Sequence, residues 1–237
     1  MDGFSYHDIF QTKGVEYLVI IAFLFLLIPF WLAINKKVNV GSKLNQALGA
    51  ITFGAIRIPQ GVFFHRNHTW SFLEKTGFAQ LGIDDMLLQM TGKVVIEQHK
   101  NPGEIINKGE LMAEIRQNGK SLRVYSPISG EVISLNHIGN NGHKETHADP
   151  FDDGWIYRVA PHRWKEETAS CLLGNEARQW VRTELERFKD FVAHSAGQIN
   201  PGNPGMVLQE GGEISESALE ALPEKVWKDF QKEFLDL

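Results

Sequence analysis

Residues 111–135 read LMAEIRQNGKSLRVYSPISGEVISL, and the pair Asn118-Gly119 within them decides the local fold. On both sides of this pair, apolar residues alternate with polar ones, as in strands that bury one face. Asn and Gly tolerate the positive φ angles that a two-residue type I′ turn requires. The stretch therefore predicts a β-hairpin closed at Asn118-Gly119, with Lys120 as the first residue after the turn.

Strand-like runs continue on both sides of this hairpin, so residues 61–160 as a whole indicate β structure. The runs are LLQMTGKVVIEQ, ELMAEIRQ, SLRVYSPI, GEVISLN and GWIYRVA. Turn signals separate them: Asn101-Pro102-Gly103, Asn118-Gly119, Ser129-Gly130 and Asn140-Asn141-Gly142. Short strands at this spacing are typical of a small sandwich or barrel.

An uncharged apolar run lies near the amino terminus. Residues 17–34, YLVIIAFLFLLIPFWLAI, contain 18 residues without a charge. At about 1.5 Å per residue an α-helix of this length just spans the hydrocarbon core of a bilayer. A cleaved signal peptide would need a positive start, and this chain begins MDGFSYHDIF. We therefore expect a transmembrane helix over 17–36 rather than a buried core helix.

The charges on either side of the run predict its orientation. Residues 35–80 carry six Lys and Arg residues against Glu74 alone, so 6 − 1 = +5. By the positive-inside rule, the amino terminus lies outside and the rest of the chain in the cytoplasm. After the span, Leu44, Leu48, Ile51 and Phe53 could line a short amphipathic helix at the bilayer surface, or the stretch could be a linker packed on the domain.

The carboxyl-terminal part is helical in pattern. Residues 163–195 place Ala177, Trp180, Val181, Leu185, Phe188 and Val192 on one face. A Gly/Pro-rich connector follows, and residues 215–237 again have helical spacing. From residue 197 on, three basic residues stand against eight acidic ones, so 3 − 8 = −5. We predict an acidic amphipathic helix that either folds back on the body or docks in a partner through Leu222, Trp227, Phe230 and Phe234.

Five short motifs, in register, resemble the glycine cleavage system H-protein family. They are Phe64-His65-Arg66-Asn67-His68-Thr69-Trp70, Gly82-Ile83-Asp84-Asp85, Ser126-Pro127-Ile128-Ser129-Gly130-Glu131-Val132, Asp149-Pro150-Phe151 and Gly154-Trp155-Ile156. The resemblance covers residues 62–190. It implies a lipoyl-type sandwich (a barrel-sandwich hybrid) with a carrier hairpin at one end and helices at the carboxyl end.

The chain departs from this family at the carrier hairpin. The family places its lipoylated lysine eight residues before the proline of the Ala-Pro-Val-Ser-Gly strand, and that position here is Gly119. Lys120 is one residue further on. Successive side chains of a strand point to opposite faces, so a shift of one residue changes which face carries the amine. The sequence therefore predicts a degenerate lipoylation site and no cofactor, with lipoate on Lys120 kept as the alternative.

Apart from Lys120, few residues suggest metal binding, catalysis or nucleotide binding. His143 and His147 lie in a loop with Asp149, Asp152 and Asp153, and they are the residues that could bind a metal ion, although a solvated loop is the simpler interpretation. His68 and Trp70 are expected to be structural, and the lone Cys171 to be a buried, inert thiol. Neither a phosphate-binding nor a dinucleotide-binding motif is present. A net charge of −5 does not favour nucleic acid as a partner.

Together these patterns predict an α+β protein with a transmembrane helix, an H-protein-like sandwich and carboxyl-terminal helices. The expected domains are an extracytoplasmic amino terminus (1–16), the transmembrane helix (17–36), a juxtamembrane linker (37–61), the H-protein-like domain (62–196), a linker (197–214) and the acidic helix (215–237). We expect a non-catalytic accessory subunit of a larger redox or electron-transfer complex in a bacterial inner membrane. The alternatives are a lipoylated carrier using Lys120 and a membrane-fusion-type adaptor of an export system.

Overall fold

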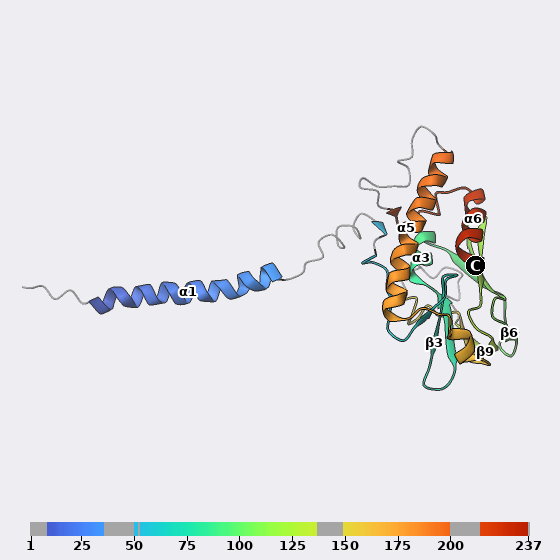
Figure 1. Cartoon of the computed structure of the whole chain (residues 1–237), viewed down its shortest axis with the longest axis horizontal. Coiled ribbons are helices and arrows are strands. Elements are labelled where there is room, and N and C mark those ends of the chain that lie inside the picture. Colours follow the sequence, from blue (N-terminus) through green and yellow to red (C-terminus); the bar gives the residue numbers. More distant parts are fainter. Residues whose placement is uncertain (1–8, 36–49, 52, 137–148, 200–213, 237) are drawn as a thin grey trace, which may run out of the picture. The chain divides into compact units, whose positions relative to one another are not determined.

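The computed structural model describes residues 9–35, 50–51, 53–136, 149–199 and 214–236. The chain divides into two compact units, residues 1–41 and residues 42–237. The first unit contains the helix α1 (Ile9–Asn35), and the second contains the remaining helices and strands shown in Figure 1.

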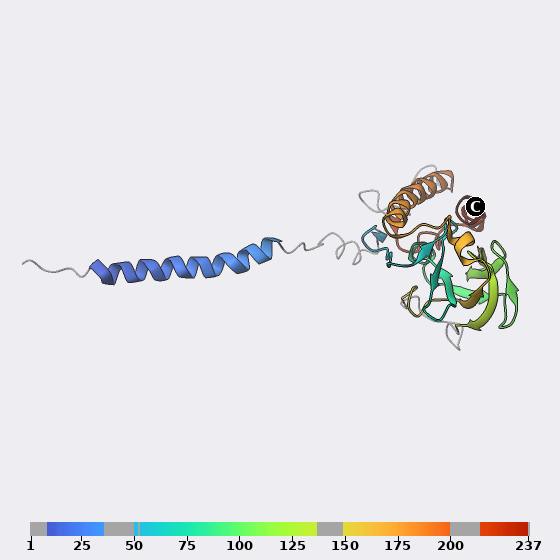
Figure 2. The same ribbon diagram turned by 60° about the horizontal axis from the view of Figure 1, so that its bottom comes forward.

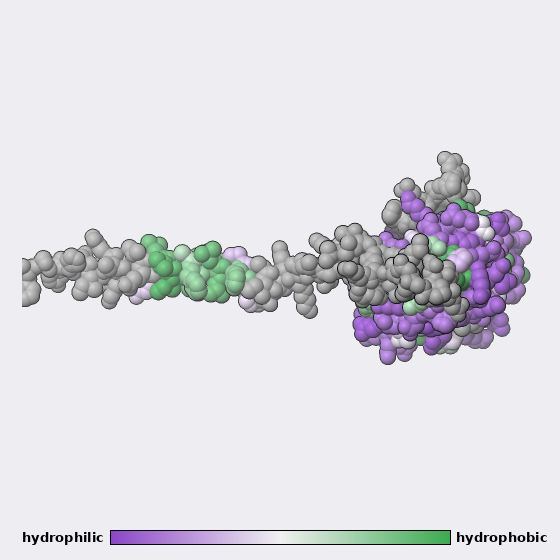
Figure 3. Space-filling model, turned by 90° about the horizontal axis from the view of Figure 1, so that it is seen from above, coloured by the Kyte–Doolittle hydropathy of each residue, from purple (hydrophilic) through white to green (hydrophobic). Residues whose placement is uncertain are grey.

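Helix α1 begins eight residues before the predicted span and includes Pro29 in its interior. From Tyr17 to Trp31 its large apolar side chains are exposed, and Figure 3 shows this stretch in green. Within the described ranges, however, no helix is both long and apolar enough to cross a membrane. The structure therefore does not support the predicted transmembrane anchor.

The second unit is built on a six-stranded antiparallel sheet. Its strand order is β2-β3-β4-β10-β9-β6. The strands are β2 (Phe63–Phe64), β3 (Thr69–Leu73), β4 (Ala79–Ile83), β6 (Ile105–Ile106), β9 (Gly130–Leu135) and β10 (Tyr157–Pro161). Alternate side chains of β4 and β10, such as Leu81 and Val159, are fully buried, because one face of this sheet covers the core.

A second sheet of three strands completes the sandwich. Its order is β5-β7-β8, with β5 (Val95–Gln98), β7 (Leu111–Gln117) and β8 (Lys120–Tyr125). The two sheets share one core, and the hydroxyl of Tyr157 on β10 donates to the carbonyl of Met112 on β7 at 3.0 Å. This confirms the α+β class and the sheet-rich, H-protein-like architecture.

The predicted helix of residues 163–195 is two helices, α4 (Trp164–Thr168) and α5 (Gly174–Ile199). Between them the backbone of Leu172 pairs with Phe64 of β2, so the helix is interrupted where the chain pairs with the sheet. A short helix α3 (Asp85–Thr91) follows β4, with the side chain of Asp84 as its N-cap. Figures 1 and 2 show α5 in orange beside α6 (Glu224–Phe230) in red.

The carboxyl-terminal segment differs from its prediction. It starts as strand β11 (Ile214–Ser215), and its helical part is limited to α6 and a π-helical turn η2 (Gln231–Leu235). Pro223 is the N-cap of α6 and has an extended backbone, with φ −68° and ψ 163°, so the helix begins only at Glu224. Leu222 is 4% exposed, and the side chains of Trp227, Phe230 and Phe234 are completely buried in this chain's own core. The fold-back alternative is therefore observed, and these four residues are not available to dock in a partner.

The stretch before the sandwich also packs on the domain in its described part. Ile51 lies in strand β1 (Ala50–Ile51), which pairs with β11, and its side chain is buried. The guanidinium of Arg182 lies over the ring of Phe53. Ile51 and Phe53 thus do not line a helix at a bilayer surface, whereas Leu44 and Leu48 lie outside the described residues.

Candidate functional site

The β7–β8 hairpin has the predicted two-residue turn. Asn118 and Gly119 have φ angles of +49° and +79°, as a type I′ turn requires. Gln117 and Lys120 face each other across the last pair of the ladder. Residues directly opposite in an antiparallel pair share one face of the sheet, so both side chains lie on the same face. Gln117 is buried and donates from Nε2 to the carbonyls of Thr91 and Lys93.

Lys120 therefore begins the inward-facing set of β8. Leu122 and Val124, two and four residues later, are buried, whereas Ser121 and Arg123 are exposed. Period-two alternation places the Lys120 side chain with the buried pair. The amine does not project from the end of the hairpin but turns back along the domain surface.

The carboxyl-terminal segment holds this amine in place. Lys120 Nζ donates to the carbonyl of Glu220 at 2.7 Å and to that of Leu222 at 3.0 Å. It also lies 4.9 Å from the ring centroid of Trp227, in a cation–π arrangement. Burial is the main cause that lowers the pKa of Lys120, and the nearby Glu220 carboxylate partly opposes it.

No local sequence signal reveals this contact. The partners lie about a hundred residues downstream of Lys120 and contribute main-chain carbonyls, whose position depends only on how the chain returns. The sequence identified Lys120 and Trp227 separately, but only the fold brings them together. An open groove of about 700 Å³ lies beside the hairpin, with Lys93, Val95, Glu114 and Arg116 among its lining residues.

Behind the hairpin a buried histidine links three elements. His68 Nδ1 lies 2.9 Å from Asp84 Oδ2, and its Nε2 lies 3.6 Å from Glu184 Oε1 on α5. Burial on its own would lower the pKa of His68, but the two carboxylates outweigh it and raise the pKa to about 9. His68 is thus a buried cation between two carboxylates, which agrees with the structural role predicted for it. Trp70, also fully buried, donates from its indole to the carbonyl of Ile83.

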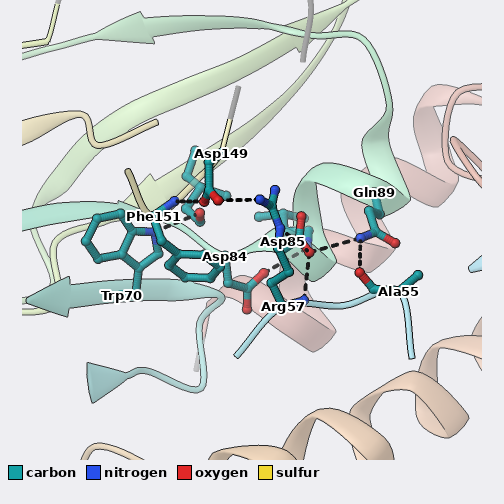
Figure 4. Close-up of polar contacts among 10 residues, drawn as sticks. Ala55, Arg57, Trp70, Asp84, Asp85, Gln89, Asp149 and Phe151 are labelled. Carbon is teal, nitrogen blue, oxygen red and sulfur yellow. Dashed lines mark hydrogen bonds and ion pairs between the residues drawn. The ribbon is translucent and has the colours of Figure 1, made fainter. Parts of the chain in front are cut away.

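A second polar cluster fixes the chain that enters the sandwich (Figure 4). The backbone N–H of Arg57 donates to Asp85 at 2.8 Å, and its guanidinium pairs with Asp149. Gln89 of α3 donates to both Asp85 and the carbonyl of Ala55. The motif residues Asp85 and Asp149 therefore tie the segment around Arg57 to the start of α3 and to the turn that begins at Asp149.

Cys171 is buried, as predicted, but the structure adds a neighbour. Its Sγ lies 2.7 Å from Nε2 of His65, a base that sequence proximity could not reveal. Burial raises the pKa of the thiol to about 11, and burial chiefly lowers the pKa of His65 to about 4. Both groups are therefore neutral near pH 7, and the thiol lacks the thiolate character that a nucleophile needs.

The predicted metal residues His143 and His147 lie outside the described residues. Within the described ranges, no group of three or more His, Cys, Asp and Glu side chains could hold a metal ion.

The two facing sheets, the type I′ hairpin and the lysine beside its turn define a lipoyl-type domain. The family model "Glycine cleavage H-protein" matches residues 62–184, and the chain belongs to this family. The probable glycine cleavage system H protein of Pyrococcus abyssi is 26% identical over 133 residues, which cover 56% of this chain and 98% of the relative.

The comparisons gave two further matches. The glycine cleavage system H protein of Saccharophagus degradans is 30% identical over 95 residues, covering 40% of this chain and 73% of the relative. A crystal structure of a glycine cleavage system H protein from Mycobacterium marinum aligns with a TM-score of 0.40 and 24% identity, over 44% of this chain and 86% of that one.

Proposed function

We propose that this chain is a non-catalytic, H-protein-like accessory subunit of a larger membrane complex, in which Lys120 has a structural role. The observation that supports this most directly is the set of contacts of the Lys120 amine. It donates to two main-chain carbonyls and lies over the Trp227 ring. An amine on a swinging arm has to leave the domain, and here its donors are satisfied within it.

The chemistry of the other clusters agrees with a non-catalytic role. The buried cation His68 pairs with Asp84 and Glu184, Glu184 pairs also with Arg187, and Cys171 with His65 forms a neutral pair. Catalysis requires a positioned acid, base or nucleophile that a substrate can reach. The redox or electron-transfer character of the complex is an inference from the kind of assembly in which such domains occur.

The test is a mild-detergent purification of the tagged full chain from its native membranes, with mass spectrometry of the retained proteins. Co-purification of cytochrome, iron–sulfur or quinone-linked subunits supports the accessory role. Recovery of the chain alone, or with glycine-cleavage or lipoyl-ligase proteins, contradicts it.

The second candidate is a lipoylated carrier. The observation that favours it is the position of Lys120 directly after the hairpin turn, in a domain of the H-protein family. The family resemblance implies a lysine-bound lipoate at this end of the sandwich. The mass of the peptide that contains Lys120, from cells with active lipoylation, decides between the two, because an unmodified peptide rules the carrier out.

The membrane location is part of the proposal. Its support is the uncharged run of residues 17–34, the exposed apolar side chains from Tyr17 to Trp31, and the excess of positive charge that follows. Exposing so much apolar surface to water is unfavourable, so α1 needs apolar surroundings, and a bacterial inner membrane with the domain on its cytoplasmic side provides them. Alkaline carbonate extraction of native membranes tests this. Release into the supernatant would place α1 against a peripheral protein partner instead.

A further inference from the structure

The carboxyl-terminal segment does more than bury apolar side chains, because it also covers the outer edge of β8. β8 is an edge strand of its three-stranded sheet. The side-chain amide of Gln231 donates from Nε2 to the carbonyl of Arg123 and accepts from the N–H of Arg123 at 2.7 Å. One side-chain amide thus satisfies the main-chain N–H and C=O of Arg123, which a neighbouring strand would otherwise bond. We call residues 217–236 the C-terminal clasp.

The clasp is fixed to the domain at its other end. The N–H groups of Ser217 and Leu219 donate to the carbonyls of Gln89 and Met90 on α3. Gly92, directly after α3, allows the close approach, since a Cβ there would lie 2.0 Å from Ser217 Oγ. The indole of Trp227 donates to Leu219, which stabilises the turn that presents the carbonyls of Glu220 and Leu222.

We propose that the C-terminal clasp controls access to the Lys120 amine, which makes Lys120 a latent acylation site. The amine stands beside the hairpin turn and the adjacent groove, and the carbonyls of Glu220 and Leu222 hold it against the domain. Local opening of the turn at residues 220–222 releases the amine without unfolding the sandwich. The proposal stands whether the chain acts as an accessory subunit or as a carrier.

The chemistry that the clasp controls is transfer of an acyl group from an activated carboxylic acid. The neutral amine attacks the acyl carbon, an amide C–N bond forms, the bond to the leaving group breaks, and the nitrogen gives up one proton. The amine needs its lone pair and an open approach for this attack. In the clasped state the amine donates to the carbonyls of Glu220 and Leu222 and lies over the Trp227 ring, so the approach of an acyl donor is restricted.

The test labels the full chain at native pH with the N-hydroxysuccinimide ester of acetic acid and follows each lysine by peptide mass spectrometry. Lys75, which is exposed, is the internal reference. We expect Lys120 to react at least about tenfold more slowly than Lys75, because its two charged hydrogen bonds must break first. The lowered pKa of Lys120 would by itself speed the reaction, so slow labelling reports restricted access. Equal rates would overturn the proposal.

A matched pair of variants connects this protection with the clasp. Gln231→Ala removes the contact with β8, and Gln179→Ala makes the same change at an exposed position of α5. Gln231→Ala should raise the labelling rate of Lys120 severalfold with no change at Lys75, and Gln179→Ala should change neither. No change at Lys120 in Gln231→Ala would contradict control by the clasp.

A reciprocal measurement keeps the proposal testable if Gln231→Ala unfolds. Coupling between two sites is mutual, so removing the amine must loosen the clasp. In Lys120→Met, hydrogen exchange at the amides of Leu222 and Val226 should become faster, while that of Leu81 in β4 stays unchanged. Unchanged exchange in the clasp would mean that Lys120 and the clasp are independent and would overturn the proposal.

Discussion

Single residues determine how tightly the elements of this domain approach one another, and Gly82 is the clearest case. It lies on β4 opposite Trp70 of β3, and the indole of Trp70 covers it. A Cβ at this position would lie 2.5 Å from the ring of Trp70, which is completely buried.

Replacing Gly82 with Ala should therefore lower the free energy of unfolding by about 1–3 kcal/mol, the usual effect of overpacking a core. The measurement is urea denaturation followed by tryptophan fluorescence. Gly54→Ala is the control, because a Cβ there has no atom within 4 Å and should change stability by less than about 0.5 kcal/mol. Equal stability of the two variants would refute the close contact.

Lys120 shows how the position of one residue in a hairpin determines its contacts. Lys120→Met keeps the aliphatic stem but leaves the carbonyls of Glu220 and Leu222 without their donor. We expect a loss of about 1–2 kcal/mol in the free energy of unfolding. Lys75→Met, at an exposed position, should have almost no effect. If Lys120→Met is as stable as wild type, the lysine has no structural role.

At the scale of elements, the segment from α6 to η2 belongs to the core. The rings of Phe230 and Phe234 stack with centroids 4.6 Å apart, and both contact Phe188 and Phe191 of α5. The amphipathic pattern alone left open whether this face packs on the chain's own domain or on a partner. These aromatic contacts show that it packs on α5.

Phe234→Ala should therefore destabilise the chain by about 3–5 kcal/mol, as expected for a buried aromatic residue cut back to Ala. Lys228→Ala in the same segment is the control, since its side chain is 69% exposed and pairs with Glu224 across one turn. Thermal unfolding followed by circular dichroism measures both. A small effect of Phe234→Ala would restore the hypothesis that this face docks in a partner.

At the scale of the whole molecule, two buried histidines make stability depend on pH in opposite directions. The pKa of His68 is about 9 in the folded chain against 6.5 for an exposed histidine. Its contribution is therefore complete below pH 6.5 and is lost as the pH rises through 9. The pKa of His65 is lowered to about 4, so its contribution is complete above pH 6.5 and is lost as the pH falls through 4.

We expect maximal stability near pH 6.5, with a loss from His68 of about 3 kcal/mol on going to pH 9.5. Urea denaturation at several pH values measures this. His68→Gln should be less stable at pH 6.5, because it removes the buried cation that pairs with Asp84 and Glu184, and its stability should fall much less between pH 6.5 and pH 9.5. If the free energy of unfolding of His68→Gln falls with rising pH as steeply as that of the wild type, His68 is neutral in the folded chain.

Much of the sandwich was predictable because its signals are local. The Asn118-Gly119 turn, the alternation of β8 and the motifs around Trp70 and Gly82 each depend on neighbours in sequence or on a simple period. The residues at which the helices begin and end were less predictable. The turn at residues 216–222 replaces the expected start of the last helix, because Pro223 and pairing with α3 compete with helix formation there.

The sequence by itself determined the H-protein-like sandwich, the hairpin and which lysine is the candidate for lipoylation. Only the tertiary structure decided what that lysine does, because its partners are main-chain carbonyls about a hundred residues away that no side-chain pattern encodes. The same holds for the contact of Cys171 with His65 and for the burial of Trp227, Phe230 and Phe234. An amphipathic pattern specifies that a face will be covered, and chain topology decides what covers it.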